Sequence, residues 1–146
     1  MNIREYKRVD FPAVSEIYAS CRKEEFINEK ETPNLLPIED DDKNLSLFRN
    51  SDIYVYEGKK IYGFATISDR CISWLYVHPD YRSKGIGSNL LKFILNNYSY
   101  PVILNVTKSN INAIRFYKWH GFEITKSFNV LVQGKKVDVI QMRNNG

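Results

Sequence analysis

The stretch Val77-His78-Pro79-Asp80-Tyr81-Arg82-Ser83-Lys84-Gly85-Ile86-Gly87-Ser88 decides the fold of this chain. An apolar run precedes it and predicts a strand, while the apolar positions after it, up to Leu95, predict one face of a helix. Gly85 and Gly87 let the backbone turn sharply and approach a ligand closely. Because the first N–H groups of the helix then point at that ligand, the segment favours a phosphate group such as a nucleotide pyrophosphate.

A second block lies downstream, Asn110-Ile111-Asn112-Ala113-Ile114-Arg115-Phe116-Tyr117-Lys118-Trp119-His120-Gly121-Phe122. It places Asn110 and Tyr117 seven residues apart, on one face of a predicted helix. Gly121 is suited to end that helix in the left-handed conformation, and Phe116 and Phe122 are assigned to the core. Two such blocks in this order are rarely accidental.

Composition indicates one globular domain over residues 1–146. Hydrophobic residues make up 43% of the 146 positions, enough for a real core. The net charge of +4 is spread along the chain, and the only tight charge run, residues 39–42, is acidic. Without a basic tract the sequence predicts no nucleic-acid partner.

Cysteine spacing and the N-terminal residues give no sign of a metalloprotein, a secreted protein or a membrane protein. Cys21 and Cys71 fit no metal or redox motif, so we expect free thiols and no metal site. The first residues lack the apolar run of a signal peptide, and no segment reaches the roughly 18 apolar residues of a membrane span. We therefore expect a cytoplasmic protein that does not associate with membranes.

Periodicity predicts a mixed α/β fold. Strands are expected at 3–7, 53–56, 61–67, 71–77, 101–106, 124–132 and 137–142, and helices after Asp10, after Pro37, over 86–97 and from Ser109 or Asn110. Asp10 is the expected N-cap of the first helix, and residues 39–42 the solvated first turn of the second. The strand at 101–106 is expected to be buried on both faces and parallel to that at 71–77. The predicted architecture is α/β (α+β), with three layers, about four helices and a mostly antiparallel sheet of six to seven strands.

The glycine loop lacks two better-known phosphate-binding patterns. Lys84 precedes Gly85, so there is no Walker P-loop, and the third glycine of a dinucleotide fingerprint is missing. An isolated Gly-x-Gly is often an ordinary strand-to-helix turn. His78 and His120 have no metal-ligand partner in spacing, and both are expected to be exposed and non-catalytic.

With Arg82-Ser83-Lys84-Gly85-Ile86-Gly87 after a strand, and Asn110 to Tyr117 before Gly121-Phe122, the chain resembles the GCN5-related N-acetyltransferase (GNAT) superfamily. The specific motifs lie between Cys71 and Phe122, and the order of elements agrees over nearly the whole chain. Asn105 makes it similar to small bacterial acetyltransferases. The resemblance implies a GNAT-like domain, acetyl-CoA as cosubstrate, no metal, and a primary amine of a small molecule or peptide as acceptor, in a monomer or homodimer.

The resemblance also implies a set of site residues. The strand at Leu75, Tyr76 and Val77 would separate from its neighbour and pair with the pantetheine amides. Asn110 would bind the pantetheine arm, and Tyr117 would protonate the departing thiolate as general acid, since a phenol has a pKa near 10. The pyrophosphate would face Arg82, Lys84 and the amides of Ser83, Lys84, Gly85, Ile86, Gly87 and Ser88.

The general base is left open, because the strand at residues 71–77 contains no glutamate. Ordered water, Asn105 holding a water, Glu25 or Asp52 could take the proton, and the N–H of Val77 or Tyr76 would stabilise the oxyanion. Tyr117 and Asn105 are the catalytic candidates. The alternative function is a catalytically weak acetyl-CoA-binding regulatory domain of the same fold.

Overall fold

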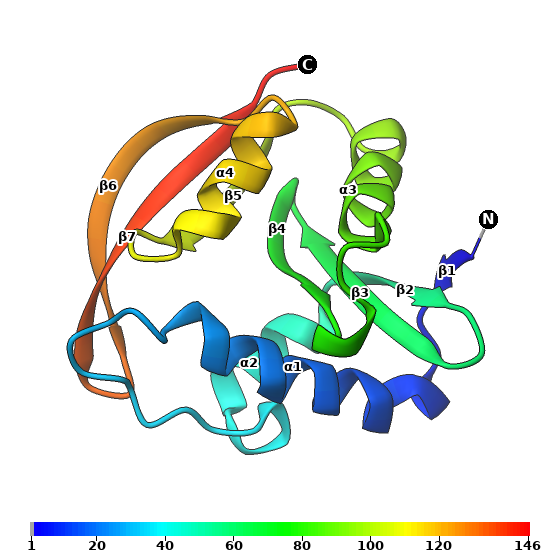
Figure 1. Cartoon of the computed structure of the whole chain (residues 1–146), viewed down its shortest axis with the longest axis horizontal. Coiled ribbons are helices and arrows are strands. Elements are labelled where there is room, and N and C mark those ends of the chain that lie inside the picture. Colours follow the sequence, from blue (N-terminus) through cyan, green and yellow to red (C-terminus); the bar gives the residue numbers. More distant parts are fainter. Residues whose placement is uncertain (1) are drawn as a thin grey trace.

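The computed structural model describes residues 2–146 (Figure 1). Within these residues it contains seven strands and four α-helices. The strands are β1 (Ile3–Glu5), β2 (Asp52–Glu57), β3 (Ile61–Ser68), β4 (Cys71–Val77), β5 (Val102–Thr107), β6 (Glu123–Val132) and β7 (Lys135–Asn144). The helices are α1 (Phe11–Glu25), α2 (Asp42–Arg49), α3 (Ile86–Asn97) and α4 (Ile111–Trp119), with short 3-10 turns at Arg8–Asp10, Ile38–Asp40 and Pro79–Tyr81.

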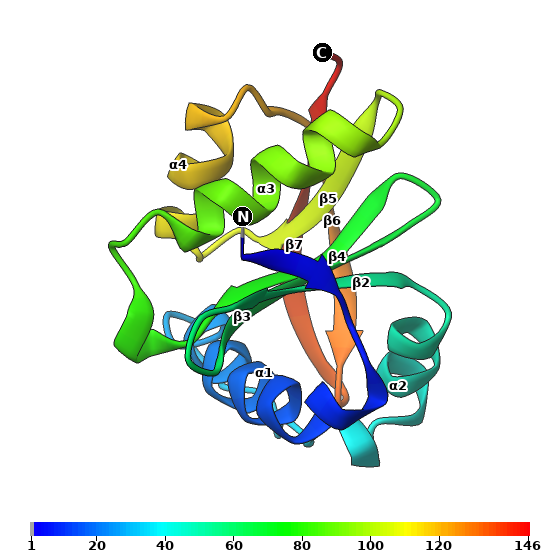
Figure 2. The same cartoon turned by 90° about the vertical axis from the view of Figure 1, so that its right-hand side faces the viewer.

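All seven strands form one sheet in the order β1-β2-β3-β4-β5-β7-β6. Every neighbouring pair is antiparallel except β4 and β5, which run parallel and are connected through α3. Helices α1 and α2 cover one face of the sheet and α3 and α4 cover the other (Figure 2). The predicted three-layer, mostly antiparallel architecture is confirmed.

Two apolar clusters hold the layers together. Leu90, Leu91 and Ile94 of α3 pack on the sheet from one side, with Phe122 after α4. Val14, Ile17, Tyr18 and Cys21 of α1 pack on it from the other side, as their helical spacing predicts. The central strand β3 between them is therefore buried on both faces over most of its length.

A β-bulge in β4 changes which way its side chains point. Ile67 of β3 is opposite Ile72 and Thr66 is opposite Trp74, so Ser73 has no partner on β3. Ile72 accordingly belongs to the cluster under α3, whereas Trp74, two residues on, belongs to the cluster under α1. The bulge reverses the direction of the side chains in the second half of β4, so Trp74 and Tyr76 both face α1.

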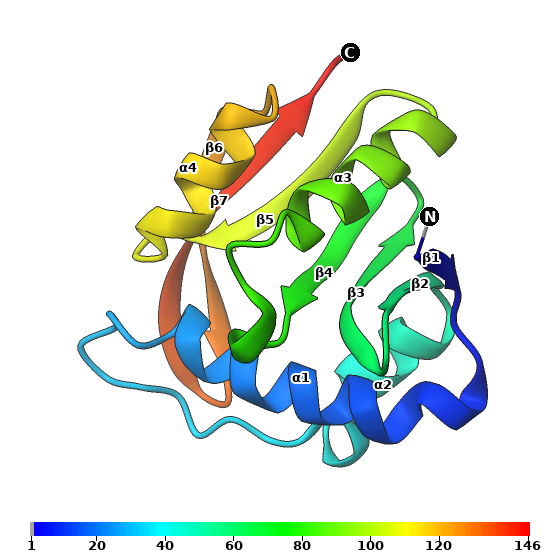
Figure 3. The same cartoon turned by 45° about the vertical axis from the view of Figure 1, so that its right-hand side comes forward.

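The sheet opens between β4 and β5. These strands pair only at Cys71 with Ile103 and Ile72 with Leu104, and then diverge (Figure 3). The prediction that β5 is buried on both faces is wrong, because Asn105 is exposed beside this opening and Ile103 is only half-buried. No helix among the described residues has both the length and the apolar character needed to cross a membrane.

Two helix starts also differ from expectation. The Asp10 carboxylate does not cap α1 but accepts hydrogen bonds from Arg4, at 2.9 Å, and from the Lys7 N–H, at 2.8 Å. The second helix begins at Asp42 rather than after Pro37, because Asp41 caps it by accepting from the Asn44 N–H at 3.1 Å. Asp10 is thus held by donors outside α1, whereas Asp41 bonds to the first turn of its own helix.

Candidate active site

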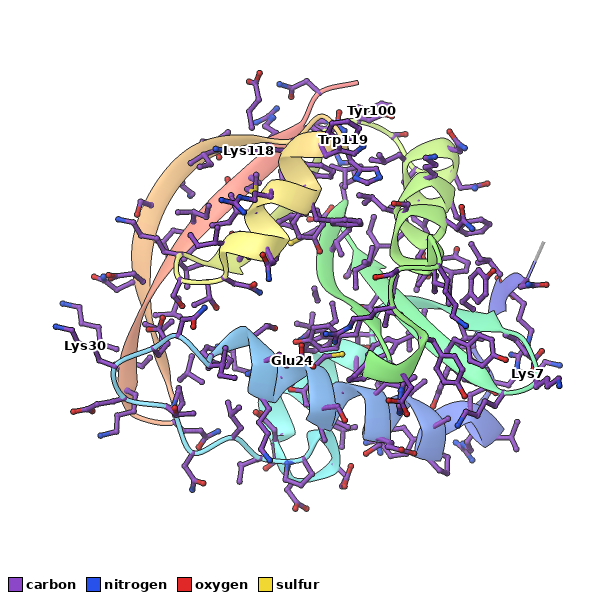
Figure 4. The ribbon with its side chains drawn as sticks, viewed as in Figure 1. Lys7, Glu24, Lys30, Tyr100, Lys118 and Trp119 are labelled. Carbon is purple, nitrogen blue, oxygen red and sulfur yellow. The ribbon has the colours of Figure 1, made fainter. Side chains whose placement is uncertain are left out.

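A cavity of about 640 Å³ lies where β4 and β5 diverge, bordered by the end of α1 and the starts of α3 and α4. Its volume is in the range of small-molecule sites. Figure 4 places Glu24, one of the lining residues, on the last turns of α1. The cavity brings together every predicted site residue except Lys84: Leu75, Tyr76, Val77, Arg82, Ser83, Gly85, Ile86, Gly87, Ser88, Asn105, Asn110 and Tyr117.

The start of α3 faces this cavity with unpaired donors. Gly85 precedes the helix with φ of +78°, and Ser83 has φ of +64°. No side chain caps α3, and its first turn contains no acidic residue. A Cβ added at Gly85 would meet no atom within 4 Å, so only the backbone conformation demands glycine there. The N–H groups of the first turn therefore have no side-chain cap, and the anion site at this helix start stays a prediction.

Arg82 connects the glycine loop to α1. Its guanidinium forms an ion pair with Glu24, and its Nε–H donates to the Val77 carbonyl at 3.2 Å. A further N–H lies 3.4 Å from Cys21 Sγ. Arg82 therefore lines the cavity with its charge already shared with a carboxylate. Lys84 lies outside the cavity lining, 6.0 Å from the ring of Tyr81.

The main chain of β4 presents unpaired groups to the cavity. The Trp74 N–H donates to Thr66 Oγ1 of β3, and the His78 N–H donates to the Tyr62 carbonyl. Because main-chain groups alternate along a strand, those of Leu75 and Val77 point the other way, to the side that β5 has left. The Val77 carbonyl already accepts from Arg82, but the N–H groups at 75 and 77 have no β5 partner.

Helix α4 contributes two predicted residues. The Asn110 side chain caps the helix by accepting from the Ala113 N–H at 3.4 Å, which leaves its amide nitrogen free of that role. Tyr117 is 9% exposed, and no hydrogen bond within residues 2–146 uses its hydroxyl. Burial, and secondarily the charge of Glu25, raises the pKa of Tyr117 well above its ordinary value, so the phenol stays protonated.

The family follows from a domain model that matches residues 49–124, described as the acetyltransferase (GNAT) domain. The match covers more than half of the chain and includes the strand, the glycine loop and α4. This chain belongs to the GNAT acetyltransferase family.

Two curated relatives of this GNAT domain are named peptidyl-lysine N-acetyltransferase YjaB. The Salmonella typhimurium protein is 30% identical over 80 residues, covering 55% of this chain and 54% of the relative. The Escherichia coli protein is 29% identical over 90 residues, covering 62% and 60%. The matched region thus spans somewhat more than half the length of these relatives.

Solved structures have the same fold. A GCN5-related N-acetyltransferase from Rhodopseudomonas palustris superposes with a TM-score of 0.81 at 17% identity, covering 99% of this chain and 94% of that one. Apo YjaB from E. coli gives 0.76 at 22% identity, covering 99% and 97%. The acetyltransferase yncA from S. typhimurium, solved with acetyl-CoA, gives 0.73 at 21% identity, covering 99% and 93%.

Of the two acids that the sequence left open, only Glu25 lies in the cavity of this GNAT domain. Its carboxylate accepts a hydrogen bond from the Tyr76 hydroxyl, and Arg22 Nη1 lies 3.7 Å away. Asp52 instead accepts from the Tyr98 hydroxyl at 2.8 Å and lines a separate cavity near the starts of α1 and β2. Burial raises the pKa of Glu25, although Arg22 and Tyr76 act in the opposite direction.

The remaining candidate side chains have structural surroundings. His78 is half-buried, and its Nδ1 accepts from the Asp80 N–H at 3.1 Å, so the expectation that it is exposed is wrong. His120 is also half-buried, 2.9 Å from the Phe116 carbonyl. Neither histidine lines the cavity. Phe116, assigned to the core, is half-buried and lines the cavity, because the opening beside β5 uncovers that side of α4.

Both cysteines are free, as expected, with Cys21 buried and Cys71 half-buried. Burial raises the pKa of the Cys21 thiol to about 11, which makes it a poor nucleophile despite its place in the cavity wall. Across residues 2–146 no group of three His, Cys, Asp or Glu side chains is arranged to hold a metal ion.

Proposed function

We propose that this GNAT domain is an acetyl-CoA-dependent N-acetyltransferase that transfers the acetyl group directly to a primary amine. One observation carries the proposal: a single cavity contains the unpaired main chain of β4, the uncapped start of α3 and the Tyr117 hydroxyl. An extended arm with a thiol at one end, amides along its length and a diphosphate at the other end matches these groups. The thiol would lie at Tyr117, the amides along β4 and the diphosphate at the start of α3. Membership of the GNAT family supports the same coenzyme.

The groups in the cavity fit the coenzyme chemically. The N–H groups at the start of α3 carry the positive end of the helix dipole and suit a diphosphate. The N–H groups of Leu75 and Val77 need hydrogen-bond partners, which the pantetheine amides would supply. Asn110 would add its amide nitrogen to that arm. When bound, the coenzyme supplies the acetyl thioester.

Three groups of this chain would act in the transfer. The Val77 N–H, which points away from β3, would stabilise negative charge on the thioester oxygen, whereas the Tyr76 N–H faces β3 and suits this role less well. Tyr117 would protonate the thiolate as it leaves. Asn105, exposed on β5 at the other side of the opening, would orient the acceptor amine or a water.

The acceptor is proposed to be a primary amine of a peptide or of a small molecule. The names of the two curated relatives, both peptidyl-lysine N-acetyltransferases, make a lysine side chain the first acceptor to test. We expect the segment after α1, whose Ile27 and Asn28 line the cavity, and the β6–β7 turn to set selectivity among amines.

Calorimetry with acetyl-CoA and release of free coenzyme A in the presence of lysine peptides and small amines test the proposal together. We expect binding, and turnover with at least one amine. If acetyl-CoA does not bind, the proposal is overturned.

The regulatory alternative has one observation in its favour, since β4 contains no glutamate to act as base. That alternative predicts acetyl-CoA binding without turnover on any amine. It also predicts that Tyr117→Phe changes nothing measurable, whereas the enzyme requires a loss of rate.

A further inference from the structure

We propose that Glu25 of α1, held by the Tyr76 hydroxyl of β4, is the group that takes the proton from the acceptor amine. The inference rests on the proposed acetyl transfer and adds the base that β4 lacks. An amine is mostly protonated near neutral pH and cannot attack a thioester until a proton has been removed. Some group in the cavity must therefore accept that proton.

Position is the first argument for Glu25. It lies in the last turn of α1, lines the cavity, and its side chain remains 21% exposed, so an acceptor can reach it. The Tyr76 hydroxyl donates to its carboxylate from the strand that also carries the Val77 N–H. The carboxylate is thereby fixed beside the part of β4 where we place the reacting thioester.

The surroundings of Glu25 make it a selective proton acceptor. On its own helix Arg22 lies 3.7 Å away, and Cys21 and Tyr18 are near enough to interact electrostatically. Tyr76 of β4 donates a hydrogen bond to Glu25, and the negative charge of Glu25 contributes to the raised pKa of Tyr117 on α4. Burial shifts the pKa of Glu25 upward while Arg22 and Tyr76 act in the opposite direction, so the net effect is an increased proton affinity.

Glu24, the neighbouring acid, is placed differently. Its carboxylate forms the ion pair with Arg82 and is 44% exposed. Its oxygens are thus engaged with Arg82, at the glycine-loop side of the cavity and not beside Tyr76. Helix geometry thus gives the two adjacent glutamates separate roles, since consecutive side chains point about 100° apart.

The proton balance closes with two of the ionisable groups that line the cavity, Glu25 and Tyr117. Glu25 takes one proton from the ammonium, and the neutral nitrogen then forms the bond to the acetyl carbon while the carbon–sulfur bond breaks. Tyr117 gives its proton to the departing sulfur and regains one from the same nitrogen. Glu25 releases its proton to solvent. One ammonium and one thioester thus yield one amide, one thiol and one free proton.

The decisive variant is Glu25→Gln, which keeps the size and removes the charge. We expect kcat/KM to fall at least 100-fold, within the range of general-base effects, while the dissociation constant for acetyl-CoA changes less than about twofold. Glu16→Gln is the matched control, because Glu16 is an exposed glutamate of the same helix outside the cavity. It should leave both quantities unchanged.

A second measurement uses the protein without coenzyme. Carbon-13 labelled glutamate allows the Glu25 carboxyl to be titrated by NMR, with Glu25→Gln identifying its signal. We expect an elevated pKa that rises further in Tyr76→Phe, because this variant removes a hydrogen bond to the charged form. The acid limb of kcat/KM should move to higher pH in the same variant, although the pKa of the amine is the same.

The outcomes separate this inference from the proposed function. If Glu25→Gln folds, binds acetyl-CoA and turns over like the wild type, Glu25 is not the base and the acetyltransferase proposal stands. If that variant does not fold, the pH profile of Tyr76→Phe tests the inference instead. The inference is overturned if the acid limb of kcat/KM lies at the same pH in Tyr76→Phe as in the wild type. If the wild type neither binds acetyl-CoA nor releases coenzyme A, the proposed function itself fails.

Discussion

The two ends of the cavity are built from different kinds of groups. At the start of α3 the donors are main-chain N–H groups, set by residues with positive φ at Ser83 and Gly85. At the end of α1 the groups are side chains, Glu25, Tyr76 and Tyr117, and all three have pKa values raised by burial. The first end relies on main-chain donors beside Arg82, whose guanidinium does not titrate near neutral pH, whereas the second consists largely of titratable groups.

This difference separates binding from chemistry. Main-chain donors cannot change protonation near neutral pH, so affinity that depends on them should be nearly independent of pH. Buried side chains exchange protons at pH values fixed by their surroundings, so rates that depend on them should vary with pH. Changes at the α3 end should therefore alter affinity, and changes at the α1 end should alter rate.

Tyr117→Phe should produce the largest effect. The variant removes one hydroxyl that opens onto the cavity and has no hydrogen-bond partner among residues 2–146, so the fold loses no hydrogen bond. Losing the proton donor should reduce kcat about 100-fold or more, with little change in acetyl-CoA affinity. The rate is measured as coenzyme A release at saturating acceptor, and the affinity by calorimetry.

Tyr98→Phe is the control for that loss, since it removes a hydroxyl that bonds Tyr54 and Asp52 outside the cavity. It should leave kcat unchanged. If Tyr117→Phe keeps full activity, Tyr117 contributes only packing and not catalysis. The proposed difference between the two ends of the cavity would then be wrong.

Gly85→Val should have the next largest effect, on affinity rather than rate. A β-branched residue disfavours φ of +78°, so the turn before α3 would change and its N–H groups would no longer converge on the diphosphate. We expect the dissociation constant for acetyl-CoA to rise at least tenfold, about 1.4 kcal/mol.

Gly134→Val matches it closely, because Gly134 also has φ of +78° and also has no atom within 4 Å of an added Cβ. Both variants carry the same backbone strain, but only one lies in the cavity. Equal affinities for acetyl-CoA in the two variants would reduce the glycine loop to a structural turn.

The α3 end could be predicted because its signals are local. The glycines, the end of the preceding strand and the start of the helix lie within the twelve residues from Val77 to Ser88, and each acts through its own backbone. The same holds for the hairpins and for the apolar face of α1, whose spacing is read directly from the chain. What the sequence missed there was the Arg82–Glu24 ion pair, which joins residues far apart in the chain.

The α1 end could be predicted only in part. Tyr117 is predicted because the block from Asn110 to Tyr117 resembles that of the GNAT family, but the choice of Glu25 over Asp52 depends on which strand α1 packs against. Tyr76 and Glu25 are 51 residues apart, and no local pattern links them. The bulge at Ser73 adds to the difficulty, because it reverses the faces of β4 without glycine or proline to mark it.

The smallest effect should be on stability, and the two ends of α1 should show opposite signs. Glu25 has a raised pKa in the folded state, so the folded protein binds its proton more tightly than the unfolded chain does. The stability from this group is complete below the unfolded pKa of about 4.3 and is lost as pH rises through the folded value. Glutamine does not titrate, so Glu25→Gln should not lose this stability. Its free energy of unfolding relative to that of the wild type should therefore increase as pH increases.

Asp10 provides the contrast at the start of α1. Its bond to Arg4 lowers its pKa, so its contribution is present above the unfolded pKa and is lost as pH falls through the folded value. Asp10→Asn should therefore be less stable than the wild type at neutral pH and approach it in acid, each difference shifting Tm by a few degrees. Urea unfolding at several pH values measures the free energy of unfolding of both variants. If that free energy depends on pH in the same way in the wild type and in Glu25→Gln, burial does not shift the pKa of Glu25.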